Sequence, residues 1–106
     1  MNSLAKFEII GNVGKITIED NRMKISVANN VSYKDKNNEG KYIEQTEWNE
    51  VTMFEGTPRY DYIKNTLKKG DLVQIEGNFA QASWEKNGQT QYGTNFVTRS
   101  LMFWSK

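Results

Sequence analysis

Polar and apolar residues alternate along most of the chain, which is the period of β-strands that bury one face. The segment 7–18 is rich in β-branched residues and carries two glycines near its middle, so it predicts a first strand with a bend. After a turn at Asp20 and Asn21, the alternation over 23–27 predicts a second strand. Residues 33–45 are mostly charged residues, Asn and Gly, and we expect a solvated hairpin loop there rather than a core element.

A third strand is predicted to begin near Thr46 and to end at Phe54, and its two faces differ in kind. Val51 and Met53 share one parity and supply a core face. Trp48 and Phe54 share the other parity, where the residues between them are polar. Because a buried face would not hold those polar side chains without partners, we expect both rings to face solvent.

One helix is predicted after this strand. Thr57 and Pro58 fit an N-cap and a first helical residue, and Gly70 fits the end of the element. The apolar residues between them, at helical spacing, are Tyr60, Ile63 and Leu67.

Two further strands follow the helix. A fourth strand begins at Asp71, and Asn87-Gly88 predicts a tight hairpin turn before a strand-like tail over 92–104. Four aromatic residues are expected in the core because they fall among other apolar positions: Phe7, Tyr60, Phe79 and Phe96. For Phe103 and Trp104, packing and binding stay equally open.

The order of three strands, one helix and two strands is that of an OB-fold. We therefore predict an all-β protein, a five-stranded OB-fold barrel with one short helix between strands 3 and 4. An SH3-like barrel also has five strands but would not normally place a full helix at that point. At 106 residues the chain suits a single domain, 1–106.

Composition excludes several classes of function. The chain has no Cys and no His, so the usual ligands of Zn sites and the commonest acid–base residue are missing. Glu47 and Glu50 fall on opposite faces of the third strand and cannot share a metal. We expect no enzyme activity, no cofactor and no metal. No apolar run is long enough to span a bilayer and the first residues lack a secretory signal, so we expect no membrane association and a cytoplasmic, nucleoid-associated protein.

Aromatic side chains, at 12% of the residues, carry the functional prediction, because a net charge of +1 by itself indicates no nucleic-acid binding. Sequence-independent binding of a single strand needs aromatic rings that stack on any base and cations that follow the phosphates. The predicted DNA-binding rings are Tyr33, Trp48, Phe54 and Trp84. The predicted phosphate contacts are Lys15, Arg22, Lys24, Lys34, Lys36 and Lys86, of which the two in the charged loop, Lys34 and Lys36, are interleaved with acids.

Several strings of the sequence resemble the bacterial single-stranded DNA-binding proteins of the replication and repair type. They keep their order and spacing over most of the chain, and they are Ile9–Gly14, Tyr33–Lys36, Glu44–Trp48, Val51–Phe54, Tyr62-Ile63 and Lys69–Gly77. The resemblance implies a homo-oligomeric OB-fold, a tetramer or at least a dimer, that coats single-stranded DNA during replication, repair, recombination or plasmid or phage transfer. The stacking residues of the family match Trp48, Phe54 and Trp84, and Tyr33 stands where the family often has Trp. The family also carries an acidic-tipped tail that recruits protein partners. The sequence ends at Lys106 without such a tail, so tail-mediated partners stay an open question.

Other functions stay open on the sequence. A replication-restart OB-fold protein, which mainly bridges protein partners, is the main alternative to a coating protein. The same aromatic residues would also serve an OB-fold that binds RNA or oligosaccharide.

Overall fold

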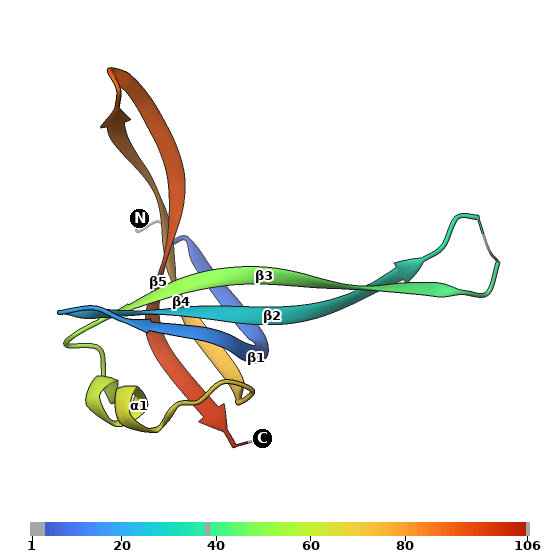
Figure 1. Cartoon of the computed structure of the whole chain (residues 1–106), viewed down its shortest axis with the longest axis horizontal. Coiled ribbons are helices and arrows are strands. Elements are labelled where there is room, and N and C mark those ends of the chain that lie inside the picture. Colours follow the sequence, from blue (N-terminus) through green and yellow to red (C-terminus); the bar gives the residue numbers. More distant parts are fainter. Residues whose placement is uncertain (1–3, 38, 106) are drawn as a thin grey trace.

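The computed structural model describes residues 4–37 and 39–105, and within them the chain forms one closed β-barrel with a short helix (Figure 1). The order of strands around the barrel is β1-β2-β3-β5-β4, with all neighbours antiparallel except β3 and β5. The helix lies between β3 and β4, so the predicted OB-fold is confirmed. The elements are β1 (Lys6–Ile18), β2 (Arg22–Lys34), β3 (Tyr42–Phe54), α1 (Tyr60–Thr66), β4 (Leu72–Lys86) and β5 (Gln89–Trp104).

The core consists of the residues that the alternation predicted for the inner face. Val51 and Met53 of β3 are fully buried. The three apolar residues from the helical segment, Tyr60, Ile63 and Leu67, pack with them in one cluster with the buried residues of β1, β2, β4 and β5. Fully burying side chains of this size stabilises a fold by roughly 1.5–3 kcal/mol each. None of the described helical residues forms a helix long and apolar enough to cross a membrane.

The predicted bend in the first strand divides β1 between two partners. Residues 6–12 pair with β4, residues 12–18 pair with β2, and a bulge lies between Val13 and Lys15. The backbone of β2 does not pair with the first half of β1. A side chain of β2 makes a hydrogen bond there instead: Asn29 Nδ2 donates to the carbonyl oxygen of Ile10 at 2.6 Å. Asn49 Nδ2 donates in turn to Asn29 Oδ1 at 2.9 Å and holds that amide in place.

The charged segment 33–45 is a smaller loop than predicted. β2 and β3 continue as a two-stranded ribbon in unbroken register to the pair Lys34 and Tyr42, and only residues 35–41 connect them. The third strand therefore begins at Tyr42, not near Thr46. The sequence pattern failed because both faces of the ribbon are largely solvated, and ladder hydrogen bonds between backbones need no apolar side chains.

The helix begins later than predicted, and Thr57 is not its N-cap. The N-cap position is Arg59, which has a φ of 68° and makes no side-chain capping bond. Thr57 instead closes the turn after β3, since its Oγ1 donates to the carbonyl oxygen of Phe54 at 2.7 Å.

Phe79 is not a core residue, whereas Tyr60 is buried and Phe7 and Phe96 pack partly buried against the core. A bulge between Glu76 and Gly77 in the β4–β5 register shifts the inner face of β5, and beyond it the two strands leave the barrel as a second ribbon. Phe79 lies at the root of this ribbon with 40% of its surface exposed. Its ring still meets Phe96 across the ladder, at 6.0 Å between centroids.

The second ribbon ends in the tight turn that the sequence predicted. Asn87 and Gly88 alone connect β4 to β5, with φ angles of 54° and 78°. Two consecutive positive φ angles are the geometry of a type I′ turn, which explains the Asn-Gly pair.

Candidate nucleic-acid interface

The outer face of β1, β2 and β3 carries the two rings predicted to face solvent. Trp48 is 61% exposed and Phe54 is 39% exposed, while Val51 between them is fully buried. Alternation along β3 therefore separates a dry inner face from an outer face that holds two large rings. Exposed aromatic rings of this size stay unburied at a cost in solvation, which points to a ligand.

Gly14 sets the position of the Trp48 ring. It is the extra residue of the β1 bulge, and a Cβ built on it would overlap Cζ3 and Cη2 of Trp48. The indole therefore lies across β2 and over the backbone of β1. In the sequence, Gly14 marks only the bend, because its contact with Trp48 joins residues 34 positions apart.

Three of the predicted phosphate-binding side chains lie on the same outer face. The ladder places Arg22 opposite Phe54 and Lys24 opposite Thr52. Lys15 stands opposite Ser26, whose partner on the other side is Glu50 of β3. The cations thus lie on β1 and β2, beside the rings of β3. Side chains that pair across a sheet are close enough to contact one ligand together.

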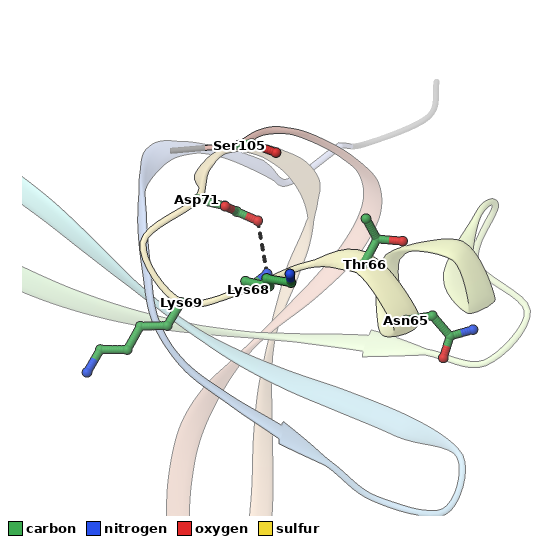
Figure 2. A pocket seen from close by; sticks show the side chains of 6 residues that line it. All are labelled: Asn65, Thr66, Lys68, Lys69, Asp71 and Ser105. Carbon is green, nitrogen blue, oxygen red and sulfur yellow. Dashed lines mark hydrogen bonds between the residues drawn. The ribbon is translucent and has the colours of Figure 1, made fainter.

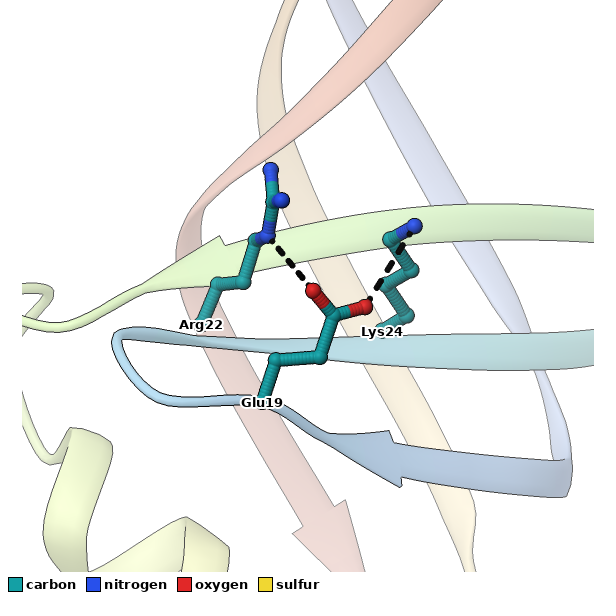
Figure 3. A network of polar contacts seen from close by, with 3 residues as sticks. All are labelled: Glu19, Arg22 and Lys24. Carbon is teal, nitrogen blue, oxygen red and sulfur yellow. Dashed lines mark hydrogen bonds and ion pairs between the residues drawn. The ribbon is translucent and has the colours of Figure 1, made fainter.

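One carboxylate holds two of these cations (Figure 3). Glu19 Oε2 accepts from Nε of Arg22 at 3.0 Å, and Glu19 Oε1 lies 3.5 Å from Nζ of Lys24. The Arg22 hydrogen bond, joined by the two positive charges, lowers the pKa of the Glu19 carboxyl below its usual value. Glu19 was not among the predicted site residues, and only the closure of the β1–β2 turn brings it there.

The β2–β3 ribbon divides the remaining predicted residues by parity. Tyr33 pairs with Ile43, on the parity opposite to that of Trp48. Tyr42 and Lys34 pair with one another on the parity of Trp48, and Tyr42 is two-thirds exposed. Tyr42 is therefore the ring that sequence reasoning missed, because we placed it in a loop. Lys36 lies in the connecting loop, beyond the last ladder pair.

Trp84 and Lys86 lie on the β4–β5 ribbon, which leaves the barrel in a different direction from the β2–β3 ribbon (Figure 1). Trp84 pairs with Gln91, six residues or roughly 20 Å along the strand from the β3–β5 contact at Val97. The four predicted rings therefore do not share one face within one copy. Trp84, half exposed, rests against Gly93, where an added Cβ would meet its Cη2 at 3.0 Å.

The hollow at the α1–β4 connection, with a volume of about 480 Å³, shares no residue with this face. Figure 2 shows Asp71 directed at the preceding turn, where its Oδ2 accepts from the backbone N–H of Lys68 at 2.9 Å. That bond closes the turn after the helix. The polar side chains of this hollow therefore have a structural role, and we assign no ligand to it. The described residues contain no group of three or more acidic, His or Cys side chains that could hold a metal ion.

Comparison with known protein families shows which family this chain belongs to. The model of the single-strand binding protein family matches residues 4–104, which is nearly the whole chain. The chain belongs to the single-strand binding protein family. The resemblance drawn from the sequence strings is thereby confirmed.

Solved structures of single-strand binding proteins share the fold over nearly their full length. A Plasmodium falciparum single-strand binding protein in complex with single-stranded DNA is 27% identical, with a TM-score of 0.77 over 99% of this chain and 98% of that one. A mitochondrial single-stranded DNA-binding protein of S. cerevisiae is 24% identical, with a TM-score of 0.67 and 95% of each chain covered. A small single-stranded DNA-binding protein of Streptomyces coelicolor is 15% identical, with a TM-score of 0.65 over 95% of this chain and 94% of that one.

Proposed function

We propose that this protein binds single-stranded DNA without sequence preference, by stacking bases on exposed rings while cations hold the phosphates. The observation that carries the proposal is the outer face of β3, where Trp48 and Phe54 are exposed beside the cations of β1 and β2. Membership of the family and the likeness to a family protein solved with single-stranded DNA support it.

The physical argument is that this face recognises what all bases share. Each ring offers a flat π-face, and a stacked base contributes on the order of 1–3 kcal/mol whatever its identity. Lys15, Arg22 and Lys24 meet phosphates, which are uniform along a strand. The face is an open sheet surface rather than a pocket, so no base edge has to be matched.

The two ribbons extend this surface. Tyr42 and Lys34 continue the parity of Trp48 along the β2–β3 ribbon, and Trp84 with Lys86 supplies a ring and a cation on the β4–β5 ribbon. A single strand of DNA that is longer than the barrel face would follow these ribbons. This reach supports a coating role in replication, repair or recombination. A cytoplasmic location together with the DNA is part of the proposal.

Self-association is the second part of the proposal, as a dimer or tetramer of identical chains. The outer face of β1, β4 and β5 is the supporting observation, because four apolar side chains there are between 40% and 54% exposed. The ladders place Ile10 and Met102 on either side of Gln74, and Leu72 opposite Trp104. An apolar sheet face of this kind on one side, with the candidate DNA face on another, suits a second copy of the chain.

Titration of Trp fluorescence with oligo-dT tests the DNA proposal. Trp48→Ala should weaken binding by about 1–3 kcal/mol and by similar amounts for oligo-dT, oligo-dC and oligo-dA, because the ring stacks without reading base edges. Trp104→Phe is the matched control, since Trp104 lies on the β1–β4–β5 face, and its affinity should stay at the wild-type value.

Two outcomes would contradict the proposal. Strong dependence on base identity would mean that the site reads base edges, and little quenching in the wild type would favour a protein that mainly bridges partners. Competition between DNA and RNA oligomers of equal length separates a DNA-binding role from an RNA-binding one.

A further inference from the structure

The Glu19 carboxylate lies between two cations of the outer face. Its two oxygens meet two different cations, Nε of Arg22 at 3.0 Å and Nζ of Lys24 at 3.5 Å, and the three side chains are between 36% and 43% exposed (Figure 3). The backbone fixes this geometry, because the Glu19 N–H donates to the carbonyl oxygen of Arg22 at 2.8 Å and closes the β1–β2 turn.

The two cations border a stacking ring. Arg22 is directly opposite Phe54 in the ladder. Lys24 is opposite Thr52, which precedes Phe54 by two positions and lies on the same face of β3. A nucleotide stacked on Phe54 has its phosphate a few ångströms from its base, which is the distance between side chains paired across two strands. A carboxylate and a phosphodiester each present two anionic oxygens, and both accept hydrogen bonds from Arg and Lys.

We propose that Arg22 and Lys24 form a subsite for one phosphodiester of the bound strand, and that Glu19 occupies this subsite in the free protein and is displaced by the phosphate. The inference rests on the proposed function and assigns Glu19 a role in it. Glu19 keeps the two cations paired when no DNA is bound, and it lowers affinity by competing with the incoming anion.

The first test compares two variants that remove the same charge. Glu19→Gln should raise affinity for oligo-dT by about 2- to 5-fold at low salt, because it removes an exposed ion-pair partner that competes with the phosphate. The dependence of log K on log salt should steepen by about 0.7, the value for one additional phosphate neutralised on a single strand. Glu50→Gln removes a charge from the same outer face, but at a residue paired with Ser26 rather than with a cation.

A double-mutant cycle separates competition from net charge. In an Arg22→Gln/Lys24→Gln background, Glu19→Gln should produce no gain, whereas any gain from Glu50→Gln should persist. Equal gains from both variants in both backgrounds would overturn the inference, and so would a loss of affinity in Glu19→Gln. Failure of the wild type to bind oligo-dT would instead overturn the proposed function.

The displacement of Glu19 can also be measured on the wild-type protein, without any substitution. Carbon-13 NMR titration of the Glu19 carboxyl should show its pKa rising when oligo-dT binds, because the carboxylate exchanges two cations for a neighbouring phosphate. An unchanged pKa in the complex would mean that Glu19 stays on Arg22 and Lys24, and it would overturn the displacement.

Discussion

Single residues decide how the rings of Trp48 and Trp84 are presented. Trp48 lies on the bulge glycine of β1, and Trp84 lies on a glycine of the neighbouring strand. In both cases the missing side chain leaves the backbone as a floor for the ring. A ring held this way loses less freedom when a base stacks on it than a ring that moves freely in solvent.

Gly14→Ala should therefore weaken DNA binding almost as much as removal of the Trp48 ring, by about 1–3 kcal/mol, because the added methyl group displaces the indole. The measurement is the affinity for oligo-dT by fluorescence titration. Adding Gly14→Ala to Trp48→Ala should then have little further effect. Fully additive losses would show that Gly14 acts on DNA independently of the ring.

Thr98 gives a prediction for stability. Its Oγ1 is buried at 2% residue exposure and finds no hydrogen-bond partner among the described residues. Thr98→Val keeps the shape and removes the unpaired hydroxyl, so the free energy of unfolding should rise by about 1 kcal/mol. Urea denaturation of the wild type and of Thr98→Val measures this difference in the free energy of unfolding. A decrease would indicate that water in the adjoining hollow, which Glu55 and Arg99 also line, bonds the hydroxyl.

At the scale of elements, the long ribbons show where sequence patterns stop being informative. Alternation predicted the barrel portions of β2 and β3, because there one face is dry. Over 42–46 every residue of β3 is exposed, so no apolar period marks the strand. The hairpin at Asn87-Gly88 was predicted in the same kind of solvated ribbon, because positive φ angles give it a signature of its own.

Register in the β2–β3 ribbon makes the two tyrosines unequal. Tyr42 shares the parity of Trp48 and Tyr33 does not, so Tyr42→Ala should weaken binding of a long oligo-dT more than Tyr33→Ala, by about 1 kcal/mol. Titrations with a long and a very short oligonucleotide measure this, and the short one should not distinguish the variants. The reverse order would mean that the twist of the ribbon, not parity, determines which ring meets DNA.

At the scale of the whole molecule, two carboxylates lie beside the apolar face proposed for self-association. Glu8 and Glu76 stand opposite one another on β1 and β4, two ladder positions from the pair Ile10 and Gln74 and on the same outer face. A hydrogen bond to Glu8, followed by repulsion from its charge, raises the pKa of Glu76 above 4.5, while Lys6 acts in the opposite direction. Arg99 lines the same hollow as Glu76 and Lys6.

Association should therefore strengthen in mild acid. A second copy on this face would remove water from the Glu8–Glu76 pair and raise the pKa of Glu76 further, so association is favoured when that carboxyl is protonated and weakens as the pH rises through its pKa. Molar mass by light scattering should increase as the pH falls from 7 towards 5, although the protein then becomes more positive overall and general repulsion grows. Glu76→Gln should associate tightly at pH 7 and lose the pH dependence.

Met102→Glu is the control for this face, because a charge at its centre should leave the protein monomeric at both pH values. Association of Met102→Glu equal to that of the wild type would place the interface elsewhere on the molecule.

The sequence by itself determined the inner and outer faces of the barrel strands, the helix between β3 and β4, the hairpin turn, and the exposure of Trp48 and Phe54. These follow from local periods and turn geometry, which are written in neighbouring residues. Only the tertiary structure decided that Gly14 supports Trp48, that Glu19 holds Arg22 and Lys24, and that Trp84 stands apart on its own ribbon. Bulges and strand register set these contacts, and a shift of one residue in register changes the face on which every later side chain lies.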